Sequence, residues 1–156
     1  MYHQTLHVII QRFLNQKKKM SCSFFEIVGS VCGVDERLRS HTTSVIPLSL
    51  CDKDIKSHMK SLQFSGVSTE ADLILARCSI FERTESFSKM TICPLHRSSL
   101  GIGWRRTRKL CCVPRTASSH SKETDKAPQA ERRINLVNSM KLLELTKELI
   151  PVDSGN

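Results

Sequence analysis

The sequence predicts a mainly α-helical protein with irregular loops, organised around a small Cys/His module that a metal ion holds together. Apolar residues recur at the three- and four-residue spacing of helices in several segments. Cys93 and His96 form a short C-x-x-H motif, and further cysteines lie on both sides of it. Hydrophobic residues make up 39% of the 156 residues and aromatic residues 5%, which leaves a thin core. We therefore expect a metal-stapled module flanked by helices, in a chain that is partly disordered.

Composition and charge divide the chain into four regions. The formal net charge of +9 is concentrated in residues 1–25 and 86–121, where no Asp or Glu occurs. The polar, aperiodic stretch TASSHSKETDKAPQA is typical of a linker. The predicted regions are an N-terminal amphipathic helix with a poorly defined segment (residues 1–50), the Cys/His module (51–115), the linker (116–130) and a C-terminal helix with its tail (131–156).

The N-terminal region begins with a basic amphipathic segment. Its apolar residues share one helical face, followed by three lysines: Leu6, Ile9, Ile10, Phe13 and Leu14, then Lys17, Lys18 and Lys19. Such a helix packs on its own domain, or lies on a membrane surface or a partner. Residues 24–34 are apolar and are interrupted by Gly29 and Gly33, so we expect a short strand or an irregular core segment there.

Two helices are predicted within residues 51–78. Ile55, Met59 and Leu62 would share one face of the first helix. The second helix opens at Ser68 or Thr69, since Thr69-x-x-Asp72 has the pattern of a capping box. That helix would deliver Cys78 at its end.

The C-terminal region contains the longest helical pattern, over residues 134–150, which ends at Pro151. We expect its apolar stripe to face the core, with Leu136, Val137, Met140, Leu143 and Ile150 on one side. We also expect the six residues that follow to be disordered and the C-terminus to be incomplete.

The seven cysteines indicate the compartment. No secretory signal or apolar run of membrane-spanning length is present. Clustered cysteines in a reducing, intracellular setting favour metal binding over disulfides. We expect the nucleus or cytoplasm, with the mitochondrion as a minor alternative because residues 1–25 lack acidic side chains.

A structural zinc site is predicted from the cysteines around the C-x-x-H motif. Cys78, Cys93, His96 and Cys111 supply four ligands at spacings of 14, 2 and 14 residues, and Cys112 is an alternative to Cys111. Zinc prefers four tetrahedral sulfur and nitrogen ligands in such sites, and a two-residue gap lets one turn supply two of them. The alternatives are cysteines that act as small buried hydrophobes, or thiols with redox chemistry.

Catalysis is not expected from this module, and we predict no catalytic residues. Residues 86–121 contain no carboxylate that could act as a general acid or base, or bind Mg²⁺. Gly101-x-Gly103 lacks the third glycine of a dinucleotide-binding loop. The sequence therefore favours a protein that is not an enzyme.

The basic stretch after the motif suggests a polyanion partner. Trp104 is followed by four cations, Arg105, Arg106, Arg108 and Lys109. The tryptophan ring could stack on a nucleic-acid base while the cations bind the phosphate backbone. Candidate partners are nucleic acid and an acidic protein. The run is also compatible with a nuclear-import patch or a merely solvated surface.

These motifs resemble a poorly characterised Cys/His domain of multi-copy proteins from aquatic animals. Its pattern is I-C-P-x-H-R, then L-G-x-x-W-R, then C-x-x-P, which is similar to the stretches beginning at Ile92, Leu100 and Cys111. The domain also carries R-C upstream, as at Arg77, and V-P-x-x-S-G downstream that runs into C-x-x-C, of which this chain has only the first part. The resemblance spans residues 71–155 and implies a metal site and a fold, with no activity.

The function expected from the sequence is that of an intracellular zinc-binding interaction module with a basic surface, associated with nucleic acid or an acidic protein. Two alternatives stay open. One is a truncated or partly disordered product without biochemical activity. The other is a peripheral membrane or mitochondrial protein that uses the N-terminal amphipathic segment.

Overall fold

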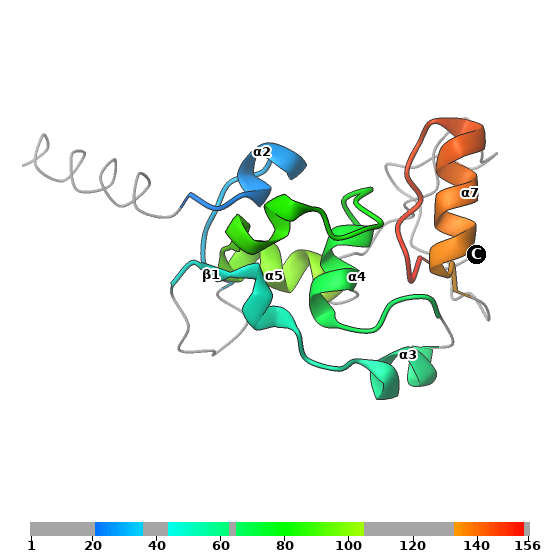
Figure 1. Cartoon of the computed structure of the whole chain (residues 1–156), viewed down its shortest axis with the longest axis horizontal. Coiled ribbons are helices and arrows are strands. Elements are labelled where there is room, and N and C mark those ends of the chain that lie inside the picture. Colours follow the sequence, from blue (N-terminus) through cyan, green and yellow to red (C-terminus); the bar gives the residue numbers. More distant parts are fainter. Residues whose placement is uncertain (1–20, 36–43, 63–64, 105–132, 155–156) are drawn as a thin grey trace, which may run out of the picture.

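The computed structural model describes residues 21–35, 44–62, 65–104 and 133–154 of the chain (Figure 1). Helices dominate these residues, and the predicted fold class is confirmed. Short 3-10 helices and one small strand pair accompany them. In chain order the elements are α2 (Phe24–Val28), β1 (Ile46–Pro47), η1 (Leu48–Cys51), α3 (Lys56–Leu62), α4 (Glu70–Ala76), η2 (Glu85–Lys89), β2 (Thr91–Ile92), α5 (Pro94–Leu100) and α7 (Leu136–Thr146).

Helix α4 begins where the capping-box pattern predicts. The Thr69 hydroxyl accepts a hydrogen bond from the Asp72 backbone N–H at 3.2 Å, and the Asp72 carboxylate accepts one from the Thr69 N–H at 3.1 Å. Both bonds satisfy N–H groups that a helix start otherwise leaves without partners. The helix is short and almost entirely buried, because Leu73 and Ile74 face two different hydrophobic clusters.

The larger hydrophobic cluster joins the first half of the chain to α5. Strands β1 and β2 pair antiparallel, with Ile46 opposite Ile92, and so bring Cys93 at the start of α5 into this cluster. Its buried members come from six parts of the chain: Cys22, Phe24, Leu48, Cys51, Ala71, Ile74, Leu75, Ile92, Cys93 and Leu100. The module therefore includes residues well before position 51.

The segment after residue 23 was predicted as a short strand or an irregular core segment; the structure forms a helix at Phe24–Val28, and residues 29–35 follow without regular secondary structure. Phe24 is fully buried in the larger cluster, and one short turn of helix satisfies the local backbone. Gly29 ends α2 in the left-handed conformation, at φ 68°, and its N–H bonds to the Phe25 carbonyl. A glycine adopts this conformation without steric cost, which is why a helix ends there.

The C-terminal residues are packed, in contrast to the disorder expected for them. Pro151–Ser154 are buried, and Val152 belongs to the smaller hydrophobic cluster. The Ile134 N–H donates to the Ser154 carbonyl at 3.0 Å, and the Asp153 N–H donates to the Ile134 carbonyl at 2.9 Å. These backbone bonds hold the segment against the residues that precede α7.

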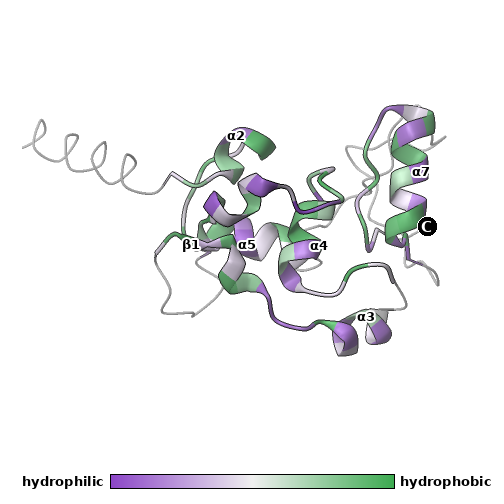
Figure 2. Ribbon diagram, in the orientation of Figure 1, coloured by the Kyte–Doolittle hydropathy of each residue, from purple (hydrophilic) through white to green (hydrophobic). Residues whose placement is uncertain are grey.

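Helix α7 buries only part of the apolar stripe that the sequence predicts: Leu136 packs against the smaller hydrophobic cluster, and Ile150, after the helix, is buried. Val137 and Met140 are exposed, whereas Ser139 is fully buried and donates its hydroxyl to the Ile150 carbonyl at 2.7 Å. Polar and apolar residues alternate along the helix, so its hydropathy gives little orientation (Figure 2). Tertiary hydrogen bonding of a serine decides which face is buried.

Several predictions lie outside the described residues: the N-terminal amphipathic helix, the linker at residues 116–130, the last two chain positions, and Cys111 and Cys112. Within the described part of the chain, none of the helices is both long and apolar enough to cross a membrane.

Candidate metal centre

Three cysteines and one histidine converge between α2 and α5. They are Cys22, Cys32, Cys93 and His96, and their ligand atoms all lie within 4.8 Å of one another. Cys93 and His96 were predicted as ligands, and the structure brings them together. The other two members come from the segment around α2, which sequence analysis did not assign to the site.

The C-x-x-H motif is fixed by the start of helix α5. Cys93 is the N-cap residue, and its sulfur accepts a hydrogen bond from the His96 backbone N–H at 3.4 Å. Pro94 occupies the first turn, where its missing N–H costs nothing. The sulfur and the imidazole of the same turn therefore face each other, with Cys93 Sγ 3.2 Å from His96 Nδ1.

The other two sulfurs approach the same ring nitrogen. Cys22 Sγ lies 3.2 Å and Cys32 Sγ 3.8 Å from His96 Nδ1, and the two sulfurs are 3.6 Å apart. A tetrahedron with Zn–S of ~2.3 Å and Zn–N of ~2.0 Å has S···S edges of about 3.8 Å and S···N edges of about 3.5 Å. The three S···N separations and the Cys22–Cys32 separation lie within about 0.3 Å of these edges, and the distances from Cys93 Sγ to the other two sulfurs are at most 4.8 Å.

The segment from Cys22 to Cys32 is anchored at both ends. Phe24 is buried and its ring lies 6.4 Å from the His96 ring, which fixes Cys22 just before α2. After Cys32, the Gly33 carbonyl accepts a hydrogen bond from the Leu95 N–H at 2.9 Å. A Cβ at Gly33 would lie 3.4 Å from the Leu95 side chain, which is ordinary van der Waals contact, so the backbone bond and not the glycine fixes this end of the segment.

Ser30 contacts the far side of the imidazole. Its hydroxyl oxygen lies 2.8 Å from His96 Nε2. When Nε2 carries the proton and donates it to Ser30, Nδ1 presents its lone pair to the three sulfurs. Metal-bound histidines usually have such a partner on the other nitrogen, which fixes both ring orientation and tautomer.

The thiols differ in how readily they ionise. Burial opposes ionisation of Cys93. In the metal-free state, when His96 carries its proton on Nδ1 instead, its hydrogen bond to the Cys93 sulfur and those from backbone groups outweigh burial and lower the pKa of Cys93 to about 6. Burial raises the pKa of Cys22 to about 12, partly offset by hydrogen bonds from the Cys93 and Phe24 backbone. Cys93 therefore ionises easily, whereas a bound cation would be needed to ionise Cys22.

Charged neighbours of the centre are already paired. Arg97 follows His96 on α5, but its guanidinium binds Glu70 at 2.6 Å, and the Glu70 side chain is nearly buried. Asp35 accepts a short hydrogen bond from the Ser98 hydroxyl on the same helix. Three thiolates and a divalent ion would carry a net charge of −1 here.

Cys78 is not part of the converging group. It follows the end of α4, where its N–H bonds to the Leu75 carbonyl, and it packs against the larger hydrophobic cluster. Burial raises the pKa of its thiol to about 12. Cys78 thus has the environment of a small hydrophobic residue, the alternative considered for these cysteines, while Cys111 lies outside the described residues.

Trp104 is unsuited to the stacking role considered for it. The side chain is only 3% exposed, and the Arg77 guanidinium lies over the ring at 4.6 Å from its centroid. A base cannot reach a ring that is buried in this way. The four cations considered with it, Arg105, Arg106, Arg108 and Lys109, lie outside the described residues.

Sequence analysis missed Cys22 and Cys32 because it sought ligands near the C-x-x-H motif. The missed residues precede His96 by 74 and 64 positions. A local signal was present: two cysteines with nine residues between them enclose a buried phenylalanine and two turn-forming residues, Gly29 and Ser30. The nine-residue gap is longer than the two- to four-residue gap typical of paired zinc cysteines, so spacing alone did not identify this pair.

Comparison with known proteins gives no relative for this chain. No family model, no curated protein and no solved structure matches it.

Proposed function

We propose that this protein is an intracellular zinc-binding interaction module, in which zinc joins the α2 segment to α5. The observation that supports the proposal is the convergence of three sulfurs on His96 Nδ1 at tetrahedral separations. Sulfur and imidazole donors without carboxylates favour zinc over calcium or magnesium, which prefer oxygen ligands. The five cysteines in the described residues are free thiols, which agrees with a reducing compartment.

The proposed ion has a structural role. Four protein ligands close a tetrahedral site and leave no position for a substrate or a water nucleophile. His96 is 1% exposed and Cys93 is fully buried, while Cys32 is partly exposed, so most of the ligand set is shielded from solvent, as in a structural site. We therefore propose that the protein is not a zinc enzyme.

The experiment is metal analysis of the purified full chain, prepared without chelator and under reducing conditions. We expect one zinc per chain, with X-ray absorption giving three sulfurs at ~2.3 Å and one nitrogen at ~2.0 Å. Single variants Cys22→Ala, Cys32→Ala and Cys93→Ala should each lose stoichiometric zinc. A chain that neither carries zinc nor binds it on reconstitution would refute the proposal.

Two cysteines outside the centre provide matched controls. Cys51 and Cys78 pack in the larger hydrophobic cluster but are not among the four converging residues. Cys51→Ala and Cys78→Ala should therefore retain one zinc per chain. Loss of zinc in Cys78→Ala, with zinc retained in Cys22→Ala, would favour the ligand set predicted from the sequence.

A polyanion partner is the second part of the proposal. Its support is charge alone: residues 86–121 carry seven basic side chains and no carboxylate. If the four cations after Trp104 each neutralise a phosphate, the logarithm of the binding constant for duplex DNA should fall with the logarithm of the salt concentration at a slope of about −3 to −4. Substituting all four cations with alanine should abolish this salt dependence of DNA binding. If the variant binds DNA with unchanged affinity, nucleic acid is not the partner of this stretch.

A further inference from the structure

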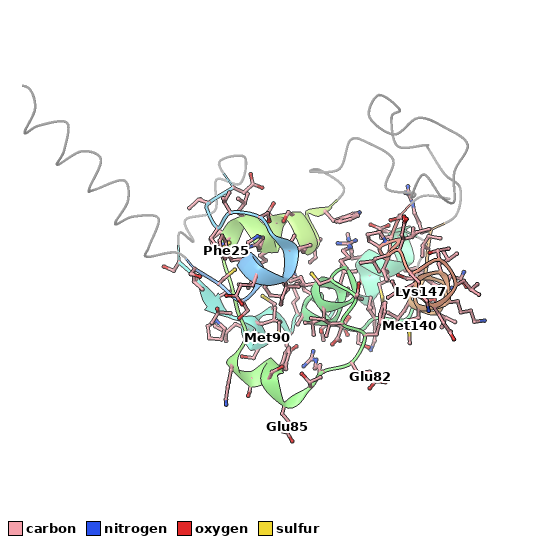
Figure 3. All side chains as sticks on the ribbon, turned by 90° about the horizontal axis from the view of Figure 1, so that it is seen from above. Phe25, Glu82, Glu85, Met90, Met140 and Lys147 are labelled. Carbon is pink, nitrogen blue, oxygen red and sulfur yellow. The ribbon has the colours of Figure 1, made fainter. Side chains whose placement is uncertain are left out.

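Cys32 is the most accessible thiol of the converging group. Its side chain is partly exposed, whereas Cys22 and His96 are 5% and 1% exposed and Cys93 is fully buried. Cys32 lies in the segment after α2 that has no regular secondary structure. Helix α2, where Phe25 is labelled in Figure 3, lies beside α5 and away from α7 in both views (Figures 1 and 3). A small reagent from solvent therefore reaches Cys32 before the other two sulfurs.

A second thiol lies next to Cys32. Cys22 Sγ is 3.6 Å from Cys32 Sγ, so an approach of about 1.5 Å would bring the two sulfurs to the ~2.05 Å of a disulfide bond. Cys22 is held in place because the neighbouring Ser23 donates its N–H to the Thr91 carbonyl at 3.1 Å and accepts the Thr91 N–H at 2.9 Å. The irregular segment around Cys32 has no helix or strand to resist this small shift.

Cys93 is a poorer partner for such a bond. It is the N-cap of α5, and its sulfur accepts the backbone N–H of His96 at 3.4 Å. A disulfide from Cys93 to either of the other sulfurs would take the cap sulfur away from that N–H. A bond between Cys22 and Cys32 leaves the start of α5 unchanged. The geometry therefore favours Cys22 and Cys32 as the pair that oxidises.

We propose that Cys32 is a site of oxidation by a hydroperoxide, that Cys22 completes a disulfide with it, and that this disulfide releases the zinc. A cysteine bound to zinc is a thiolate, which is the form that attacks a peroxide. An accessible thiolate beside a second cysteine is the arrangement of redox-sensing cysteines. The release of zinc rests on the proposed metal centre, whereas the pairing of the two thiols rests on their separation alone.

The reaction with hydrogen peroxide balances in two steps. The Cys32 thiolate attacks one peroxide oxygen, so that an S–O bond forms, the O–O bond breaks and hydroxide leaves. The Cys22 thiolate then attacks the Cys32 sulfur, so that the S–S bond forms, the S–O bond breaks and a second hydroxide leaves. The two thiolates lose two electrons to the peroxide, and protons from solvent convert both hydroxides to water. Zinc then keeps only Cys93 and His96, which are too few for a closed site.

The test is treatment of the zinc-loaded full chain with equimolar hydrogen peroxide in the presence of a chromophoric zinc chelator. We expect one zinc to be released for each disulfide that forms, and a sample without peroxide to keep its zinc. A thiol reductant reverses the reaction by exchange, so reduction followed by added zinc should restore the original zinc content.

Peptide mapping identifies the disulfide. Cys22 and Cys32 lie on one tryptic peptide, residues 20–37, because no lysine or arginine occurs between Lys19 and Arg37. After alkylation of free thiols, the disulfide leaves this peptide unlabelled and lighter by the two thiol hydrogens. Cleavage after Glu26 should leave its two halves linked. Cys93 lies on another tryptic peptide, residues 90–97, and should be alkylated.

Cys32→His is the variant that separates zinc binding from oxidation. It offers two sulfurs and two nitrogens, a ligand set that zinc also accepts, but it has no thiol at position 32. It should bind zinc and keep it in peroxide. Cys51→Ala and Cys78→Ala should release zinc as the wild type does, and since Cys78 is also partly exposed, it controls for exposure alone. If Cys32→His does not hold zinc, the peptide map of the wild type decides.

The outcomes separate this inference from the metal proposal. Zinc content before oxidation tests the centre, and the peptide map tests the thiol pair. Zinc that stays bound in peroxide, a disulfide to Cys93, or a sulfinic acid at Cys32 without a disulfide would overturn the inference and leave zinc binding intact. A chain without zinc that still forms the Cys22–Cys32 disulfide would refute the centre and support the thiol pair. A chain that shows neither would refute both.

Discussion

Arg77 and Asp153 form an ion pair in which neither side chain has any exposed surface, with the guanidinium nitrogen 3.2 Å from the carboxylate oxygen. The same guanidinium donates to the carbonyls of Leu100 and Gly101 on one side and Val152 on the other. Arg77 thereby connects the ends of α4 and α5 to the C-terminal segment. Five donors in a planar fork allow one side chain to serve all these partners.

Breaking this pair should be costly. Asp153→Asn keeps the shape of the side chain and tolerates the left-handed backbone at φ 69°, but it removes the carboxylate charge that is paired with the buried Arg77. We expect a loss of about 3 kcal/mol in the free energy of unfolding, measured by urea denaturation. Asp52→Asn removes a carboxylate from the exposed Arg83 pair and should cost less than about 1 kcal/mol. Equal losses in the two variants would contradict the role given to Arg77.

The Ser30 hydroxyl should increase the affinity of the metal centre for zinc. Ser30→Ala removes the hydroxyl that faces His96 Nε2, so the imidazole loses the partner that fixes its tautomer. We expect the zinc dissociation constant to rise about tenfold in competition with a chromophoric chelator, and Ser30→Thr to restore it. Ser99→Ala is the control, because the Ser99 hydroxyl contacts only the backbone carbonyl of His96 in the described residues. An unchanged affinity in Ser30→Ala would exclude this role.

The pH dependence of stability should include a contribution from Asp72. Burial alone would raise the pKa of this carboxyl, but hydrogen bonds from Arg83 and Thr69 outweigh it and hold the pKa below its ordinary value. A pKa that is lower in the folded state stabilises the protein above the unfolded pKa of ~3.9, and this contribution disappears as the pH falls through the folded pKa. At pH 7 we expect Asp72→Asn to cost about 1 kcal/mol through the lost cap.

The difference between wild type and Asp72→Asn should shrink as the pH is lowered from 5 towards 3. Unfolding of both proteins in urea at several pH values measures it, with the metal removed from both so that ligand protonation does not contribute. A difference that stays constant over this range would show that the charge of Asp72 does not stabilise α4.

Local patterns predicted the parts of the structure that depend on neighbours in the chain. The capping box of Thr69 and Asp72 and the pairing of Cys93 with His96 both involve residues three apart, where helix geometry alone sets the contact. Cys22 and Cys32 reach His96 through tertiary packing, which leaves no periodic signal.

In the C-terminal region, too, the local helix could be predicted from the sequence but its tertiary contacts could not. The helix was predictable from the helical period of its apolar residues and from Pro151. The burial of Pro151–Ser154 depends instead on backbone hydrogen bonds to Ile134 and on the bond from Arg77 to Asp153, two residues that are 76 positions apart in sequence. Such contacts carry no hydrophobic pattern that could be read along the chain. The apolar stripe predicted the burial of α7 only in part: Leu136 packs against the smaller cluster, but Val137 and Met140 are exposed while the hydrogen-bonded Ser139 is buried.

The buried face of α7 can be tested by comparing two substitutions on opposite sides of the helix. Ser139 is fully buried against the Ile150 carbonyl, so Ser139→Leu must place a large side chain where there is no room. We expect it to lower the free energy of unfolding by about 2 kcal/mol, and Ser139→Ala by about 1 kcal/mol through the lost hydrogen bond. Val137 is 54% exposed, and Val137→Ser should change stability by less than about 0.5 kcal/mol. Urea midpoints of the three variants provide the measurement. A larger loss in Val137→Ser than in Ser139→Leu would mean that the helix docks through the apolar stripe predicted from the sequence.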